Sequence, residues 1–190
     1  QARRSPVFWM YASALSMHAL FGTAVTFHIV DIFESAGRTR VEAFAYFLPQ
    51  AIVSLTVNLI ASALADRMAL KPLLVLMLAG FVLGAFGLLA LQSTLGYWLL
   101  VAGFGLGGGL WGVLSNLGYV RNFGRLHLGE ITGLSTALTV FASATGPLLF
   151  SLGVDWFASY AAAVTVCLVM NLVLLVAAAI IRHHEPGRRT

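Results

Sequence analysis

The chain has 190 residues, of which 59% are hydrophobic and only 9% are charged. A soluble domain carries roughly 25% charged residues, and a soluble chain of this length cannot bury so many apolar side chains. The composition therefore predicts an integral membrane protein with lipid as its solvent. The net charge of +4 does not indicate a nucleic-acid partner, because the Lys and Arg residues form short clusters between apolar runs. Cys167 is the only cysteine, which excludes an intrachain disulfide.

Six apolar runs are long enough to cross a bilayer. A span needs roughly 20 apolar residues, because the hydrocarbon core is about 30 Å thick and a helix rises about 1.5 Å per residue. The first run is too long for a signal peptide and has no small-residue cleavage site, so we interpret it as a span. The charge-free stretch 72–120 divides at the polar turn 92–96. The expected spans are 7–30, 43–65, 72–91, 97–118, 131–152 and 157–181.

The basic residues alternate between the two sides of the expected membrane. Nine of the eleven lie before the first span, after the second, after the fourth or after the sixth. The other two, Arg38 and Arg40, lie in a connection that also carries acidic residues. Because cytoplasmic connections carry an excess of Lys and Arg, this pattern predicts an all-α membrane protein of six transmembrane helices with both termini in the cytoplasm.

Polar residues recur at intervals of four on the second span, at Gln50, Ser54 and Asn58. This spacing places them on one slowly drifting helix face, and polar side chains within a span usually face the bundle interior. We interpret the face as part of a solute pathway, with simple interhelical hydrogen bonding as the alternative. Pro49 on the same span predicts a kink.

On the first span, Tyr11, His18 and Thr26 lie on roughly one face. His18 lies well inside the span, where an ionisable side chain is costly and usually functional. We expect His18 to carry a proton or to bind solute, and the alternative is a neutral histidine bonded to a neighbour. His28 and Asp31 lie one turn apart near the outer end, and we interpret them as an interfacial pair without a role.

The fourth and fifth spans add three candidates for the pathway, namely Asn116, Thr139 and Ser143. Ser and Thr also bond to carbonyls of their own helix, so these residues alone are a weak indication. Gly146 and Pro147 follow on the fifth span. Pro147 predicts a kink, because it leaves the carbonyl four residues earlier without an N–H partner.

The fourth span is rich in glycine over residues 103–112. Small residues four apart let helices approach closely in lipid, and glycine also makes a helix easier to bend, so close packing and a hinge both remain open. The run contains a G-x-G-x-x-G pattern, but a dinucleotide site needs a preceding strand and a βαβ unit, so we exclude one. The glycines assigned to packing or bending are Gly105, Gly108, Gly109 and Gly112.

No group of residues suggests catalysis. The spans contain no paired carboxylates, the sequence has no Ser-His-Asp pattern, and no His or Cys spacing fits a metal. We therefore expect no enzymatic activity, no cofactor and no metal site.

The connection between the second and third spans carries a recognisable pattern. Residues 62–71 resemble the G-x-L-x-D-R-x-G-x-[RK] loop of the major facilitator superfamily, with Ser62 and Ala69 in place of its glycines. The segments 4–9, 119–133 and 146–160 resemble bacterial monocarboxylate or oxalate/formate antiporter-like members. The positions that match the loop pattern are Leu64, Asp66, Arg67 and Lys71.

This resemblance implies the C-terminal half of a twelve-helix secondary transporter in a bacterial inner membrane, with a missing N-terminal six-helix half as its partner. It implies that the first and fourth spans line a central cavity, that the second and fifth form its sides, and that the third and sixth are peripheral. Asp66 would meet the start of the fifth span and close a cytoplasmic gate. Arg67 and Lys71 would face anionic lipid or loop carboxylates.

The expected function is secondary active transport of a small solute by alternating access, with proton coupling or antiport. An organic anion such as a monocarboxylate is one candidate solute. However, no Lys or Arg lies inside any expected span, and this leaves the class of solute open. The alternative is a stand-alone six-helix protein that pairs with itself or with a separate half, or a scaffold without transport activity.

Overall fold

The computed structural model describes residues 5–65 and 67–181, and within them every regular element is a helix. Five helices are long and apolar enough to cross a membrane, or six if a bent pair at the N-terminal end is one span. An all-helical membrane protein is therefore confirmed. The helices are α1 (Pro6–Phe27), α2 (Ile29–Ser35), α3 (Arg40–Ala45), α4 (Phe47–Ala65), α5 (Leu70–Leu89), α6 (Thr94–Phe123), α7 (Leu128–Phe157) and α8 (Tyr160–Ile180).

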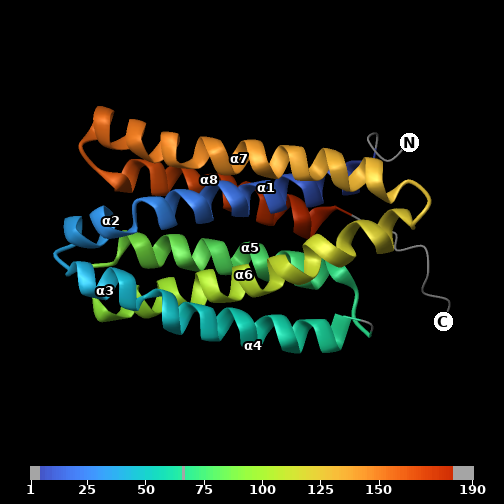
Figure 1. The fold of residues 1–190 in the computed structure, drawn as a ribbon, viewed down its shortest axis with the longest axis horizontal. Coiled ribbons are helices and arrows are strands. Elements are labelled where there is room, and N and C mark those ends of the chain that lie inside the picture. The colour runs from blue at the N-terminus through green and yellow to red at the C-terminus, as the bar shows by residue number, and fades with distance from the viewer. Residues whose placement is uncertain (1–4, 66, 182–190) are drawn as a thin grey trace.

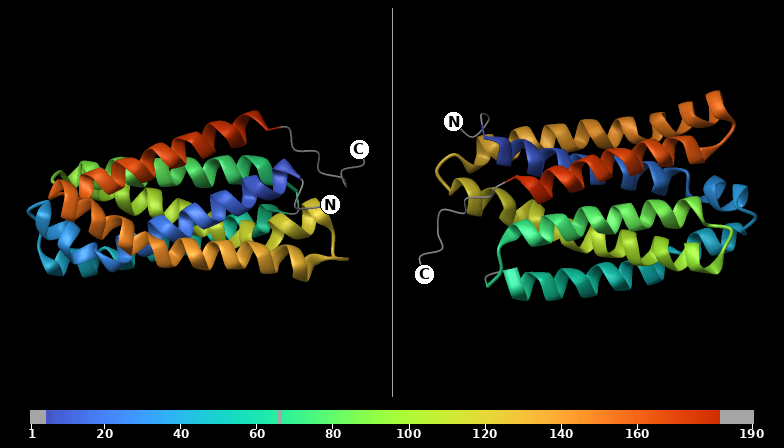
Figure 2. Two further views of the ribbon diagram at one scale, coloured as in Figure 1. Left: turned by 90° about the horizontal axis from the view of Figure 1, so that it is seen from above. Right: turned by 180° about the vertical axis from the view of Figure 1, so that it is seen from behind.

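The long helices run alternately up and down one elongated bundle (Figure 1). The start of α1, the end of α8 and the α4–α5 and α6–α7 connections lie at one end, which we call the basal end. The α2–α3, α5–α6 and α7–α8 connections lie at the opposite end, the distal end. Helices α4 and α7 lie at opposite edges of the bundle (Figures 1 and 2). We compare burial over the apolar 18-residue stretch of each long helix. Only 6% of this stretch is buried in the helix that contains α4 and 17% in α7, against 56% in α5 and in α6. Helix α5, expected at the periphery, is thus well packed within this chain.

The first expected span, 7–30, is divided by a bend. Helices α1 and α2 meet at His28, and their axes differ by 67°. The bend turns α2 across the distal end, where Ile32 and Phe33 are buried. The Phe33 ring packs against Tyr46 at 6.1 Å and against Tyr97 at 6.2 Å between centroids. Burial of these apolar side chains accounts for a short helix that leaves the axis of α1.

The second expected span, 43–65, lies in one continuous helix, Arg40–Ala65, whose main-chain hydrogen bonds are interrupted at Tyr46, between α3 and α4, while the backbone of Tyr46 itself stays helical. Thr39 begins α3 with a capping box, in which its side chain accepts from the Glu42 N–H and the Glu42 carboxylate accepts from the Thr39 N–H. Pro49 has no N–H to offer the carbonyl of Ala45, and α3 ends at Ala45. The interruption therefore lies where the proline removes a helical hydrogen bond.

Glycines bring α6 close to α5. A Cβ added at Gly80 would lie 3.0 Å from the Gly103 carbonyl oxygen and from the Gly107 nitrogen. One turn further along α5, a Cβ at Gly84 would lie 2.5 Å from the Phe104 ring. The two helices are therefore in backbone contact, which only residues without a side chain permit.

A second row of glycines on α6 faces α4. A Cβ at Gly109 would lie 2.5 Å from the Ser54 carbonyl oxygen, and one at Gly105 would lie 2.6 Å from the Val53 side chain. Because Gly105 and Gly109 are four residues apart, they form a small-xxx-small pair that admits the opposing helix. Helix α6 is thus held between α4 and α5 on two different glycine faces.

Side chains tie the distal end together. Arg38, in the α2–α3 connection, donates from Nε to the Leu91 carbonyl at 2.6 Å and from Nη2 to the Ser93 carbonyl at 2.8 Å. It also pairs with Glu42 at 2.8 Å and lies over the Tyr97 ring at 5.2 Å. Leu91 and Ser93 lie in the α5–α6 connection, so Arg38 joins this connection to the α2–α3 connection.

We expect Gly109→Ala to destabilise the protein by about 1–3 kcal/mol, because the added methyl meets a backbone oxygen that cannot move aside. Thermal unfolding in detergent measures the effect. Gly133→Ala is the matched control, since it makes a similar helix substitution at a position with nothing within 4 Å of the added Cβ. Equal stability of the two variants would contradict the close approach of α4 and α6.

We expect Arg38→Met to cost about 1.5–3 kcal/mol for each main-chain bond lost to the charged donor. Arg40→Met is the control, because Arg40 is largely exposed and lies 3.7 Å from Glu34. Unfolding temperatures of the two variants should differ clearly. If Arg38→Met unfolds at the same temperature as Arg40→Met, the distal clamp is not stabilising.

Candidate functional site

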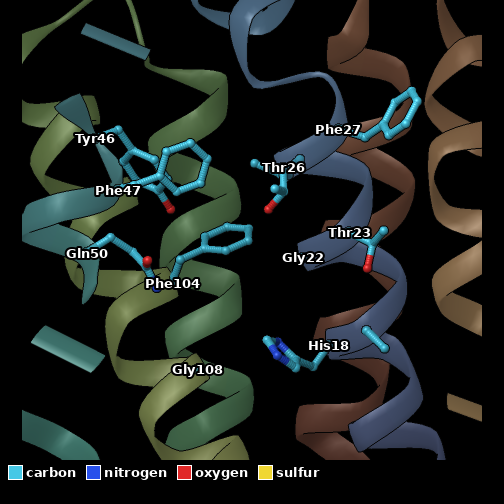
Figure 3. Close-up of a pocket in the computed structure, with 12 residues that line it drawn as sticks. His18, Gly22, Thr23, Thr26, Phe27, Tyr46, Phe47, Gln50, Phe104 and Gly108 are labelled. Atoms are coloured by element: carbon cyan, nitrogen blue, oxygen red, sulfur yellow. The ribbon is translucent and has the colours of Figure 1, made fainter. Parts of the chain in front are cut away.

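A cavity of about 620 Å³ lies between α1 and α4, with α6 as its floor (Figure 3). It begins near the middle of α1 and reaches the distal end of that helix. Four lining residues, His18, Thr23, Thr26 and Gln50, carry polar side chains, and four of the rest are aromatic. The lining consists of His18, Ala19, Gly22, Thr23, Val25, Thr26, Phe27, Tyr46, Phe47, Gln50, Phe104 and Gly108.

His18 forms the basal end of this cavity, and its ring points from α1 into the space beside α6 (Figure 3). The imidazole is stacked on Phe81 of α5 at 4.8 Å and lies 5.0 Å from Trp111 of α6. Its Nδ1 is buried without a hydrogen-bond partner, and so is the Trp111 indole nitrogen. A buried polar atom without a partner is costly, so these two atoms mark a place where a ligand group or a water would be stabilised.

The glycine one turn after His18 leaves space beside the edge of this imidazole. A Cβ at Gly22 would lie 3.5 Å from Cε1 and 3.8 Å from Nδ1 of His18. Gly22 itself lines the cavity. A larger residue there would therefore cover the edge of the ring that carries the unpartnered nitrogen.

Polar and aromatic side chains both line the cavity. Thr26 on α1 and Gln50 on α4 face one another across it, and Phe47 and Phe104 lie beside them (Figure 3). None of the described residues that line it is Asp, Glu, Lys or Arg. Because an isolated charge in such surroundings is strongly disfavoured, this part of the protein holds neutral, hydrogen-bonding groups and apolar surface.

On the basal side of the cavity, aromatic rings fill the seam between α1 and α6. Tyr11 is fully buried, and a Cβ at Gly118 would lie 2.8 Å from its ring. Tyr11 and Phe8 pack against Tyr119 at 6.4 Å and 5.9 Å between centroids, and Phe8 also contacts Phe123 at 6.4 Å. The lining of the cavity ends at His18, on the distal side of this seam.

The structure brings together some of the residues assigned to the pathway from the sequence. His18, Thr26 and Gln50 line one cavity, and Gly108 forms part of its floor. Asn58 instead reaches across to α6, where its amide donates to the Gly109 carbonyl at 2.9 Å. A Cβ at Gly112 would lie 2.6 Å from the same amide, and one at Gly108 would lie 3.4 Å from the Ser54 hydroxyl. Ser54 and Asn58 thus belong to the α4–α6 contact.

The side chains of most other pathway candidates form hydrogen bonds with the rest of the bundle. Asn116 donates to the Gly112 carbonyl at 2.8 Å, and Thr139 donates to the Ser135 carbonyl at 2.9 Å. Each of these bonds lies within one helix, which is the common behaviour of such residues. Ser143 shares a hydrogen bond of 2.9 Å with Thr23, and this bond joins α7 to α1. Tyr11 lies in the basal aromatic seam.

Helix α7 meets α1 closely at Gly146. An added Cβ there would collide with the Leu20 carbonyl of α1. Pro147 follows inside α7, and the helix continues through it from Leu128 to Phe157. Helices α1 and α7 are therefore in backbone contact at Gly146, directly before Pro147.

The proposed gate loop is only partly described. Asp66 lies outside the described residues, so its contact with the start of α7 stays a prediction. Lys71 donates from Nζ to the Ala179 and Ile181 carbonyls, both at 2.8 Å, and so caps the end of α8. Arg67 is exposed, and the nearby Arg121 of α6 donates to the Met68 carbonyl at 3.2 Å.

The aromatic side of the cavity was missed from the sequence. Tyr46, Phe47 and Phe104 are ordinary apolar residues of a span when judged by periodicity alone. Trp111 and Phe81, which hold the His18 ring, give no stronger signal. Only the packing of three different helices brings them to one place.

No protein-family model matches the chain, and no curated protein or solved structure matches it significantly. The function must therefore be argued from the geometry and chemistry of these residues.

We expect the Thr23–Ser143 bond to couple α1 and α7 by about 0.6 kcal/mol, with an upper value near 1.7 kcal/mol for bonds between membrane helices. A double-mutant cycle of Thr23→Val and Ser143→Ala, followed by unfolding in detergent, measures this coupling. The control cycle replaces Ser143→Ala with Thr139→Ala, whose hydroxyl bonds within its own helix. Equal coupling in the two cycles would remove Ser143 from the α1–α7 contact.

Proposed function

We propose that the chain is a six-helix half of a secondary transporter of the major facilitator type, which moves a small solute across a membrane by alternating access. The observation that carries this proposal is the cavity between α1, α4 and α6, with a buried imidazole at its end. Ionisable groups inside membrane spans are rare, and they mark solute or proton pathways.

The pairing of the helices supports an inverted repeat. The most extensive pairings are α5 with α6, α1 with α7, α4 with α6, and α5 with α8. If α1, α4 and α5 are exchanged with α6, α7 and α8 respectively, the α1–α7 pairing becomes the α6–α4 pairing, and the α5–α6 pairing becomes the less extensive α8–α1 pairing. The α5–α8 pairing is unchanged by the same exchange. Each half of the exchange holds three spans, so the two halves have opposite orientation, as in the nested repeats of such transporters.

The charges support an orientation. Among the described residues, the basal end carries Arg67, Lys71, Arg121 and Arg125 with one carboxylate, Glu130. The distal end carries two arginines with four carboxylates, Asp31, Glu34, Glu42 and Asp155. Under the positive-inside rule, the basal end is cytoplasmic. We accordingly propose a plasma membrane location, with the cavity on the outer side of the aromatic seam.

Exposed apolar faces on two helices are evidence for a partner half. Helices α4 and α7 expose large apolar side chains, among them Leu48, Leu55 and Phe141, which are 62–71% exposed. Together with lipid, a second six-helix unit is the partner that would cover them. The cavity between α1 and α4 would then lie near the boundary of the two units, where transporters of this type hold their solute.

The residues of the cavity suggest how solute and proton are handled. His18 lies in a cavity whose described lining carries no counter-charge. Its unpartnered nitrogen can accept a hydrogen bond or a proton, and Gln50 and Thr26 can orient a polar solute. Movement of the two halves would then open this site alternately to each side of the membrane.

The test is uptake into proteoliposomes under an imposed proton gradient, with the complete reading frame that encodes the chain and a panel of labelled neutral and anionic solutes. A gradient of one pH unit is worth about 1.4 kcal/mol, so coupling to one proton would accumulate a neutral solute about tenfold. His18→Ala should abolish the dependence of uptake on the gradient.

Asn58→Ala is the matched control, because Asn58 holds α4 against α6 and does not line the cavity. This variant should lower the amount of folded protein or the rate of uptake. The pH dependence of uptake should be retained. Indistinguishable pH profiles for the two variants would remove His18 from the proton route. Folded protein that transports no solute of the panel would count against secondary transport.

A further inference from the structure

The bend between α1 and α2 is held by a cluster of polar groups at the distal end. His28 lies at the bend and is 9% exposed. Groups from three other places reach its ring, namely Asp31 on α2, Pro147 and Ser151 on α7, and Tyr160 on α8. The ring also lies parallel to Phe150 of α7, at 6.2 Å and an angle of 15°. No part of the proposed transport route uses this cluster.

The contacts fix one proton on the imidazole. His28 Nε2 lies 3.2 Å from the Pro147 carbonyl oxygen. A carbonyl has no proton to give, so Nε2 must carry one and donate it. The Ser151 hydroxyl is 3.5 Å from the same nitrogen. The remaining nitrogen, Nδ1, lies 3.4 Å from the Tyr160 hydroxyl and 3.9 Å from the Asp31 carboxylate.

In the neutral form of His28, one hydrogen bond in this cluster is missing. The Tyr160 hydroxyl also lies 3.4 Å from Asp31 Oδ2, and it has a single proton to donate. If Tyr160 donates to Asp31, the lone pair of Nδ1 faces a lone pair of the Tyr160 oxygen, with no proton between them. If Tyr160 donates to Nδ1, Asp31 loses its bond from the hydroxyl.

A second proton on His28 completes the chain of donors. Nε2–H then donates to Pro147, Nδ1–H donates to the Tyr160 oxygen, and Tyr160 O–H donates to Asp31. The imidazolium also gains the Asp31 carboxylate as its counter-charge. We propose that His28 is a proton-binding site at the distal end, and that proton binding locks the α1–α2 bend onto α7 and α8.

The other charges around the cluster do not compensate the imidazolium. At this end Arg38 pairs with Glu42, and Arg40 lies 3.7 Å from Glu34. Asp155 is one turn beyond Ser151 on α7 and is exposed. Among the described groups that contact the His28 ring, Asp31 is therefore the carboxylate that responds to its charge.

The lock would act on the distal end of the cavity. Thr26 and Phe27 line the cavity and directly precede His28 in the chain. On the other side of the bend, Phe33 packs against Tyr46, which lines the opposite wall. Release of α2 from α7 and α8 would therefore displace both walls of the cavity at its distal end. Histidine changes its charge between about pH 5 and pH 8, so the pH on the distal side would set the position of these walls.

The test measures the position of α2 and does not depend on transport. Spin labels at Glu34→Cys on α2 and Leu172→Cys on α8, in a Cys167→Ala background, are placed in the complete protein in liposomes. Leu172 lies twelve residues beyond Tyr160, or about 18 Å along the helix. Double electron–electron resonance then gives the distance distribution between the labels at several pH values. We expect a narrow distribution near pH 5 that shifts or broadens towards pH 8.

Three variants make the result specific. His28→Gln can still donate to Pro147 but cannot take a second proton, so the dependence on pH should be lost. Asp31→Asn removes the counter-charge and should reduce the change in distance between low and high pH. His127→Gln is the control, since this exposed histidine lies at the basal end, and it should keep the transition. A distribution that does not change with pH in the unaltered protein, or a transition that persists in His28→Gln, would overturn the proposal.

Discussion

The structure depends on the backbone contact that glycine allows along α6. In lipid, apolar side chains gain little by meeting each other rather than acyl chains, so helices associate through close packing and hydrogen bonds. Helix α6 meets this constraint twice, with Gly103 and Gly107 against α5 and with Gly105 and Gly109 against α4. These contacts fix the positions of α4 and α5 on α6, and so they fix where α4 stands relative to α1. The cavity is the space left between α1 and α4, with Gly108 as part of its floor.

The polar side chains divide into two groups with different consequences. Most of them are satisfied by helix carbonyls, as with Asn58, Asn116 and Thr139. These bonds hold the bundle together and leave nothing for a ligand. His18 belongs to the second group, because its Nδ1 is buried beside the cavity without a partner. The unpartnered nitrogen together with the place of His18 in the cavity lining distinguishes this residue from Asn58, Asn116 and Thr139.

Much of the helical architecture could be predicted, since apolar length and charge-free runs depend only on local sequence. The bend at His28 could not, because no proline or glycine marks it and its cause is the burial of Ile32 and Phe33 under other helices. Helical spacing predicted one polar face with His18 and Thr26 on the first span and another with Gln50 on the second, and the structure places these three residues in the lining of one cavity. The same reasoning could not separate them from Asn58, because that depends on which helix faces each side chain. Tyr160, which completes the His28 cluster, is 132 positions away in the chain.

Alternating access is tested most directly by the side from which the cavity can be reached. In sealed proteoliposomes of known orientation, a cysteine at Gln50 should react with an impermeant thiol reagent from one side at a time. Reversal of the proton gradient should change that side. Thr56→Cys, on the exposed face of α4, should react from neither side in lipid. Reaction of the Gln50 cysteine from both sides under one condition, or from neither under any condition, would contradict the account.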